Sequence, residues 1–271
     1  MKSSSINRRD DSMKMAGLMP DECPEGNEIS YIAFKDNNPS LNRKQTLKAE
    51  DHKNKIFSPL DHLIPKVFKR AADIILSMIV IFLVLTWFIP LIALLIKIDS
   101  KGPVFFLQKR NGRNGKLFTC LKFRSMILND ESDLTPVWKY DQRITHLGSI
   151  LRKYHLDEFP QFLNVLWGNM TLVGPRPHMV SENQIYESLI PNYSLRYRVK
   201  PGITGLGQVN NGILTTPLRK MEIRIYWDTF YIINWKPGMD TLILYRTLIY
   251  FLNTLNIFQP SEALLGKVAA K

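Results

Sequence analysis

The chain of 271 residues contains 36 Lys and Arg against 24 Asp and Glu, which gives a formal net charge of +12, and 45% of it is hydrophobic. This composition excludes collagen-like, coiled-coil and disulfide-scaffold proteins. The two cysteines, Cys23 and Cys120, are far apart in the sequence, which argues against a disulfide framework or a cysteine zinc site and fits a reducing compartment.

The positive charge is confined to one part of the chain. Residues 1–65 contain 10 basic and 10 acidic residues, whereas residues 66–271 contain 26 basic and 14 acidic residues, so 26 − 14 accounts for the whole +12. Such an excess indicates an anionic partner, which could be nucleic acid, an anionic membrane surface or a phosphorylated substrate.

Residues 1–65 are polar and show little apolar periodicity. They cannot bury enough apolar surface to offset the entropy of ordering, so we expect a mostly disordered leader. The first residues also lack the apolar core of a cleavable signal peptide.

A membrane segment follows. The 23 residues Ile74–Ile96 carry no charge, and as a helix they would measure roughly 34 Å, enough to cross a bilayer core. Basic residues favour the cytoplasmic side, and they lie on both flanks, at Lys66, Lys69 and Arg70 before the run and at Lys97, Lys101, Lys109, Arg110 and Arg113 after it. Both ends therefore favour the same side, which indicates a re-entrant helix in residues 66–100. Pro90 predicts a kink inside it.

The body, residues 101–258, reads as a small globular domain followed by a tail, 259–271. Residues 105–124 predict a β-hairpin with its turn at 111–115. Helical patterns cover 146–155, 158–167, 179–198 with a break at Pro191, and 219–234. Residues 241–258 are strongly apolar, and the sequence leaves open whether they form a core helix or lie in the membrane interface.

Asp157 and Glu158 are adjacent and precede an apolar-periodic stretch. One interpretation is that Asp157 caps a helix and Glu158 complements its positive end. A catalytic interpretation is compatible with it, because helix starts attract phosphate and neighbouring helical side chains diverge by about 100°. One acid could address a reacting phosphorus while the other holds a metal ion.

Four basic residues are candidate phosphate ligands. Arg176 lies between Pro175 and Pro177, whose fixed φ angles predict a stiff loop that presents the guanidinium. Arg152 precedes Asp157 by five residues, and Lys122 and Arg124 would point to one face of a strand. The alternative is that these residues form ordinary solvated surface. The glycine-rich stretch 200–207 matches no nucleotide-binding motif, and the five histidines have no metal-ligand spacing.

Together these segments resemble the bacterial sugar transferases, the monotopic polyprenyl-phosphate phosphoglycosyl transferases. The similarity covers about residues 66–253 and comprises FKRAADIILS at the membrane helix, KFRSM at 122–126, DQRITHLGSILRKYHLDEFPQFLNVLWGNMTLVGPRP at 141–177, VKPGITGLGQVN at 199–210 and DTFYIINW at 228–235. The chain departs from the family pattern at Ile89, Asn169 and Leu206-Gly207. These departures leave a hydroxyl-assisted kink, the loop packing and the sugar preference open.

The resemblance implies an α+β, mainly helical fold, with a re-entrant N-terminal helix and a cytoplasmic catalytic domain at the inner membrane. It implies that Asp157 attacks the β-phosphate of a nucleotide sugar, with a UDP-sugar as the expected donor. Nucleoside monophosphate would leave, and polyprenyl (undecaprenyl) phosphate would then accept the phosphosugar. Glu158 would help hold Mg²⁺.

The basic body also suits the anionic inner leaflet, and a homo-oligomer is compatible with the sequence. Two other classes of protein remain to be weighed. A non-enzymatic membrane scaffold or polysaccharide chain-length regulator would explain the charge and the anchor, but not the acid pair. A nucleic-acid-binding module is disfavoured because the basic residues are spread rather than striped with aromatic residues, so no nucleic-acid partner is expected.

Overall fold

The computed structural model describes residues 58–128, 141–210 and 216–255. The chain divides into two units, Met1–Ile56 and Phe57–Lys271, and all described residues belong to the second. Most of the predicted leader and the predicted tail therefore lie outside the described residues. Residues 58–65 are part of the folded unit: they include the 3₁₀ turn η1 (Pro59–Asp61), and helix α4 begins at Leu63.

The apolar segment forms a continuous helix from Leu63 to Asp99. It consists of α4 (Leu63–Val80), a π-helical turn η2 (Ile81–Leu85) and α5 (Thr86–Asp99). By length and composition it could cross a membrane, and only 17% of its most apolar window is buried. Phe82 and Leu83 are 68% and 70% exposed. The prediction of an apolar helix compatible with membrane association is therefore confirmed.

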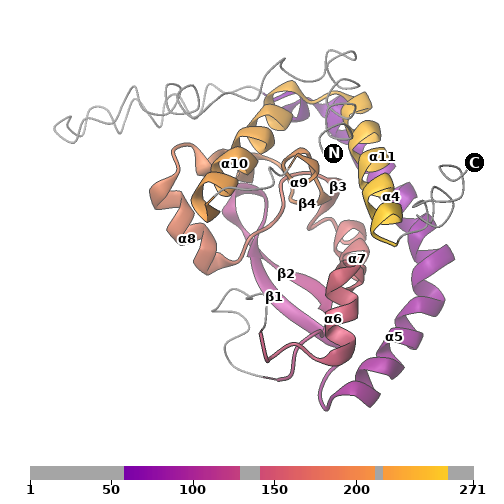
Figure 1. The fold of residues 1–271 in the computed structure, drawn as a ribbon. Helices are drawn as coiled ribbons and strands as arrows, with labels where there is room; N and C mark the ends of the chain where they lie inside the picture. The colour runs from indigo at the N-terminus through magenta and orange to yellow at the C-terminus, as the bar shows by residue number, and fades with distance from the viewer. Residues whose placement is uncertain (1–57, 129–140, 211–215, 256–271) are drawn as a thin grey trace, which may run out of the picture. The chain divides into compact units, whose positions relative to one another are not determined.

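The helix is irregular one turn before Pro90. The Thr86 N–H donates to the Ile81 carbonyl, five residues back, and the Thr86 hydroxyl donates to the Ile81 and Phe82 carbonyls. Pro90 has no N–H, and its ring crowds the Thr86 carbonyl, so a π turn directly before Thr86 relieves this strain. Figure 1 shows the axis changing direction between α4 and α5.

The predicted hairpin is present. Strand β1 (Phe105–Asn111) pairs antiparallel with β2 (Leu117–Phe123), and a short turn η3 (Arg113–Gly115) joins them, with Asn114 at a φ of 57°. A second sheet, which the sequence did not predict, pairs β3 (Thr171–Val173) in parallel with β4 (Gly202–Thr204). A Cβ at Gly202 would lie 2.2 Å from the Gly174 nitrogen, so this close approach requires glycine.

The predicted helices in the described part of the body are present as α6 (His146–Lys153), α7 (Gln161–Leu166), α8 (Val180–Leu189), α10 (Pro217–Asn234) and α11 (Pro237–Thr254). A short helix, α9 (Leu206–Val209), follows β4, and η5 (Tyr193–Arg198) follows the expected break at Pro191. Helix α11 buries Met239 and Ile243 near its start and exposes Tyr245, Leu248 and Tyr250 further along. It thus contributes to the core at one end only.

A hydrophobic cluster joins the apolar helix to the body. Ile92 and Ile96 of α5 pack with Phe123 of β2 and Leu151 of α6. Full burial of such side chains stabilises a fold by ~1.5–3 kcal/mol each. Figure 1 shows α6 and α7 beside the hairpin, with α5 on the side of α6 away from it. Leu156 and Phe159, which flank the acid pair in the sequence, also pack against this cluster, so the second half of the apolar helix is fixed next to that pair.

The predicted helix cap is wrong. Asp157 and Glu158 belong to a separate 3₁₀ turn, η4 (Leu156–Glu158), which follows His155 at a left-handed φ of 56°. Helix α7 begins only at Gln161, and its cap, Pro160, offers no side-chain acceptor. Because the turn and the helix are distinct, both carboxylates are available for contacts across the fold.

Candidate active site

Glu158 is the centre of a charged cluster drawn from three distant segments. Arg176 Nη1 donates to Glu158 Oε2 at 2.8 Å, and Arg176 Nη2 donates to Oε1. Lys122 Nζ donates to the same Oε1 at 2.7 Å. Lys122 comes from β2, Glu158 from η4 and Arg176 from the loop after β3. Burial alone would raise the pKa of Glu158, but Arg176 and Lys122 hold that pKa well below its usual range.

Asp157 has a different environment, although it is the next residue. Its side chain is buried, and no described residue donates a hydrogen bond to its carboxylate. Burial, reinforced by the negative charge of Glu158, raises the pKa of Asp157, and Lys122, Arg152 and Arg176 offset part of that rise. The pair thus consists of one carboxylate bound by cations and one that is close to cations without being bound.

Of the other two candidate phosphate ligands, Arg152 lies near the acid pair and Arg124 does not. Arg152 lies within electrostatic range of Asp157 and donates to the Ser125 hydroxyl at 3.1 Å. The structure does not bring Arg124 to the cluster. Its guanidinium donates instead to the carbonyls of Ser100 at 2.6 Å and Lys101 at 2.8 Å, at the end of α5. Carbonyls at a helix C-terminus lack partners within the helix, and a cation satisfies them.

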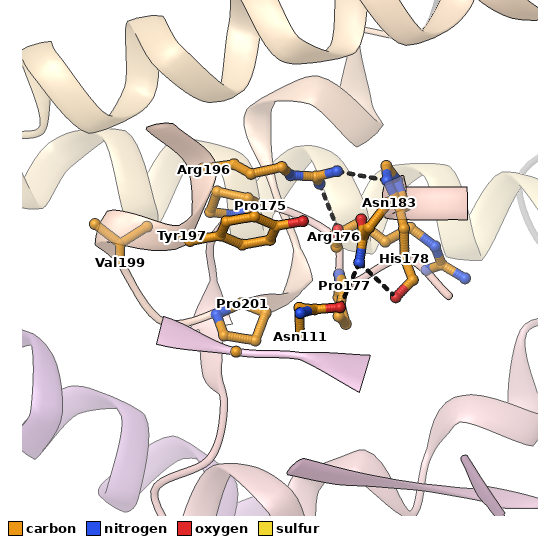
Figure 2. Close-up of a pocket in the computed structure, with 11 residues that line it drawn as sticks. Asn111, Pro175, Arg176, Pro177, His178, Asn183, Arg196, Tyr197, Val199 and Pro201 are labelled. Atoms are coloured by element: carbon orange, nitrogen blue, oxygen red, sulfur yellow. Dashed lines mark hydrogen bonds between the residues drawn. The ribbon is translucent and has the colours of Figure 1, made fainter. Parts of the chain in front are cut away.

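Two further arginines hold the Arg176 loop, and sequence reasoning missed both. Arg110 Nη1 donates to the Pro177 carbonyl at 2.7 Å. Arg196 Nη2 donates to the Arg176 carbonyl and lies 3.2 Å from Asp228 Oδ2 in a buried ion pair. Figure 2 shows the Arg196 guanidinium reaching the Arg176 backbone, with prolines on either side of Arg176. No local sequence signal identifies these contacts, because they join residues 20 to 67 positions apart.

His178 packs behind the same loop as a neutral ring. Burial, then the charges of Arg196 and Arg224, lower the pKa of His178 well below its ordinary value. Its Nδ1 lies 2.9 Å from the Tyr193 hydroxyl, and its Nε2 lies 3.1 Å from Arg224 Nη1. Arg196 Nη1 also contacts Nδ1, so both ring nitrogens face guanidinium groups, which can only donate and therefore disfavour the protonated ring. His178 thus supports the loop.

The cavity behind this loop, drawn in Figure 2, has a volume of about 10 Å³. That is room for about one water molecule. Arg176, His178 and Arg196 are among its lining residues. A nucleotide sugar therefore has no space behind the loop, and would have to approach the Asp157–Glu158 pair from elsewhere.

The acid pair fits a magnesium ion in one specific way. Among the described residues no cluster of three or more His, Cys, Asp or Glu could form a protein cage for a metal ion. Mg²⁺ does not need one, because it is commonly held by one or two carboxylates together with substrate phosphates. The Asp157–Glu158 donor set meets that requirement, provided that Glu158 exchanges a cationic partner for the ion.

A long exposed apolar helix is joined to a small body that gathers two carboxylates with Lys122, Arg152 and Arg176, and an enzyme that acts on phosphates at a membrane would need these features. Residues 64–254 match the bacterial sugar transferase family, and the chain belongs to that family.

Several curated relatives are similar over the same region. A UDP-glucose:undecaprenyl-phosphate glucose-1-phosphate transferase of Klebsiella pneumoniae is 47% identical over 70% of this chain and 41% of its own length. The protein of the same name from Escherichia coli is 44% identical over 67% of this chain and 39% of its own. The exopolysaccharide production protein PSS of Rhizobium leguminosarum is 44% identical over 68% of this chain and 94% of its own. The chain thus spans about two fifths of the first two relatives.

Proposed function

We propose that this chain transfers a phosphosugar from a UDP-sugar to undecaprenyl phosphate and releases UMP, through a covalent intermediate on Asp157. The observation that carries the proposal is the contrast within the acid pair. Glu158 is bound by Arg176 and Lys122, whereas Asp157, beside it, accepts no hydrogen bond from the described residues. A nucleophile needs a free lone pair, and Asp157 has one next to phosphate-binding cations.

The chemistry proceeds in two displacements at one phosphorus atom. An Asp157 oxygen forms a bond to the β-phosphorus, and the bond from that phosphorus to the bridging oxygen breaks, so UMP leaves with the electron pair. A phosphate oxygen of the lipid then attacks the same phosphorus, and the Asp157–phosphorus bond breaks to regenerate the carboxylate. Arg176, Lys122 and Arg152 supply positive charge where negative charge accumulates.

The site would also use a divalent cation. Repulsion between a carboxylate and a phosphate charge at ~4 Å is about 4 kcal/mol at an effective dielectric near 20. The cationic side chains already bind or face the acid pair, so they cannot also neutralise an incoming diphosphate fully. Glu158, together with substrate phosphates, would hold Mg²⁺, which supplies charge neutralisation at the diphosphate.

We further propose that the helix Leu63–Asp99 is re-entrant, with the body at the cytoplasmic face of the inner membrane and against its anionic leaflet. Basic residues on both flanks and the π turn before Pro90 support this topology. It would place a water-borne nucleotide sugar and a lipid phosphate at one interface. Cysteines introduced at Leu63 and Lys109, in a chain without its native cysteines, should be labelled from the same side. Labelling from opposite sides would mean that the helix spans.

The sugar and the pathway follow from the relatives as proposals. Two of them are named for glucose-1-phosphate transfer to undecaprenyl phosphate, another, from Aeromonas hydrophila, for N-acetylgalactosamine, and the Rhizobium protein for exopolysaccharide production. We propose UDP-glucose as the first donor to test. The reaction would then begin the membrane-bound assembly of an exopolysaccharide or a related surface glycan.

The decisive experiment measures both the products and the adduct. The full chain, reconstituted with undecaprenyl phosphate, is given a panel of UDP-sugars, and UMP release is followed. Intact-mass spectrometry without the lipid acceptor should detect a phosphosugar adduct, which Asp157→Asn should abolish together with turnover. Glu158→Gln serves as the comparison, since it should slow turnover without removing the nucleophile. Near-normal turnover of Asp157→Asn would contradict the proposal.

A further inference from the structure

A second cavity, with a volume of about 160 Å³, lies between the start of α4 and the segment 198–200. Asp157, Glu158 and the cations around them are not among its lining residues. Instead, six other cationic side chains line it: Lys66, Lys69, Arg70, Arg113, Arg198 and Lys200. Asp73 is the one acidic residue of the lining. Such a concentration of positive charge around one cavity favours an anionic ligand.

Asp73 does not neutralise this cavity by pairing with its cations. Its Oδ2 accepts a hydrogen bond from the Thr171 hydroxyl at 2.6 Å, and its Oδ1 accepts one from the Leu172 N–H at 2.9 Å. The Asp73 carboxylate therefore accepts its hydrogen bonds from residues of β3. Lys69 pairs with Asp240 at 2.6 Å and Arg198 pairs with Asp61 at 3.1 Å, and neither acid lines the cavity.

Lys66 and Lys200 have no acceptor for their ammonium groups among residues 58–128, 141–210 and 216–255. Lys200 is half-buried, and burial, followed by the charge of Arg70, lowers its pKa. Lys200 Nζ and Arg70 Nη2 lie on the same side of Gly168, and the Arg70 guanidinium donates there to the Val165 carbonyl at 2.6 Å and the Leu166 carbonyl at 2.8 Å. Arg70 therefore adds a fixed positive charge beside Lys200, and the ammonium groups of Lys66 and Lys200 are the donors that an anion in the cavity would meet.

The cavity also has an apolar part and a position that relates it to a membrane surface. The side chains of Leu60, Val173, Val199 and Tyr231 contribute to its lining. Lys66, Lys69, Arg70 and Asp73 follow the i, i+3, i+4, i+7 spacing of one helix face. Ile64, Val67 and Phe68 lie on another face of the same turns and are 81%, 57% and 58% exposed. This division into a cationic and an apolar face is typical of a helix that lies in a membrane interface with its cations at headgroup level.

We propose that this cavity binds the phosphate of an anionic phospholipid, as a second anion site separate from the Asp157–Glu158 pair. Lys66 and Lys200 would contact the phosphate oxygens, Arg70 would add positive charge beside them, and the apolar lining would take the first carbons of the lipid. A cavity of about this volume admits a group the size of benzene. The inference goes beyond the proposed transfer and does not depend on it, because this binding requires no nucleotide sugar.

The test is a lipid titration of the purified full chain in detergent, followed by native mass spectrometry. Phosphatidylglycerol and phosphatidylcholine are compared as ligands, with inorganic phosphate and UMP as soluble competitors. We expect one phosphatidylglycerol to bind roughly tenfold more tightly than phosphatidylcholine. Lys66→Gln and Lys200→Gln should each weaken that binding by about tenfold, since each removes a charge-assisted contact. Lys220→Gln, an exposed lysine of α10 outside the cavity, should have no effect.

Thermal unfolding provides the second readout. Phosphatidylglycerol should raise the midpoint of the native chain by mass action and should leave the double variant of Lys66 and Lys200 unchanged. Without lipid, the variants should unfold at or above the native midpoint, because they remove like charges. Asp157→Asn should bind the lipid normally, because Asp157 does not line the cavity. Failure of the transferase proposal can therefore be told apart from failure of the lipid-site proposal. Three outcomes would each overturn the inference. They are equal binding of the two lipids, unchanged binding in the lysine variants, and displacement of the bound lipid by inorganic phosphate as effective as displacement by lipid.

Discussion

Arg176 and Glu158 form a two-point ion pair, in which both terminal nitrogens of the guanidinium donate to the two oxygens of one carboxylate. The Glu158 charge raises the pKa of Arg176 further, and the two groups lock each other in their charged forms. A planar fork of this kind also fits phosphate oxygens. In the proposed reaction, Arg176 would turn from Glu158 to a phosphate of the substrate.

Replacing Arg176 tests the two-donor geometry of its guanidinium separately from its positive charge. Arg176→Ala should lower turnover by about 10²–10³-fold, because it removes a preorganised donor pair and leaves Glu158 with only Lys122. Arg176→Lys keeps the charge and loses the second donor, so its loss should be smaller but measurable. Steady-state UMP release measures both. Native turnover in Arg176→Lys would mean that the two-donor geometry is unimportant and would contradict a bidentate role.

The pH dependence of turnover should report Asp157. Its pKa is raised by burial and by Glu158, and the nucleophile is the charged form. Activity should therefore fall as the pH drops through this raised pKa, at a pH above the ordinary aspartate value of about 3.9. Asp157 and Glu158 interact, so the acid limb of the pH profile, where activity falls at low pH, reflects the titration of the pair and not of one residue. Lys122→Gln should move the limb to higher pH because it removes a stabilising positive charge. A limb that stays in place in this variant would argue against the assignment.

Metal removal tests the proposed role of Glu158 independently of that of Asp157. If Glu158 holds the divalent cation, excess EDTA should abolish turnover and added Mg²⁺ should restore it. Glu158→Gln should raise the Mg²⁺ concentration needed for half-maximal activity, because an amide is a weaker ligand than a carboxylate. Titration of UMP release with Mg²⁺ gives that concentration for each chain. Full turnover in EDTA would exclude the metal from the reaction.

Arg196 should prove more sensitive to replacement than its ion-pair partner. Burial raises the pKa of Asp228 to about 6, since Arg196 and Arg224 only partly compensate for the cost of a buried charge. Asp228→Asn relieves that cost and keeps an acceptor, so it should change the thermal midpoint little. Arg196→Met frees the Arg176 carbonyl and leaves Asp228 unpaired, for which about 3–5 kcal/mol is expected. The free energy of unfolding from denaturant titration measures both.

The raised pKa of Asp228 also fixes the sign of its effect on pH-dependent stability. A carboxyl whose pKa is higher in the folded than in the unfolded chain favours folding while it is protonated. Its contribution is complete below the unfolded value of about 3.9 and is lost as the pH rises through about 6. The pH dependence of the unfolding midpoint should lose this component in Asp228→Asn. An unchanged profile would show that another group is responsible.

Local patterns in the sequence determined the apolar helix, the hairpin at 105–124, the break at Pro191 and the acid pair as the centre of interest. Helical and strand periodicity, turn residues and a long uncharged run act between near neighbours, so they can be read without the fold. Only the tertiary structure decided how the charges are used. Arg124 satisfies the end of α5 instead of joining Lys122, and Asp157 is no helix cap. Arg110 and Arg196 hold the Arg176 loop, and the cations of the second cavity come from segments more than 100 residues apart. A buried charged side chain needs a partner because burial without one is costly, and the partner can come from any segment that the fold brings near. Distance along the sequence therefore does not identify it.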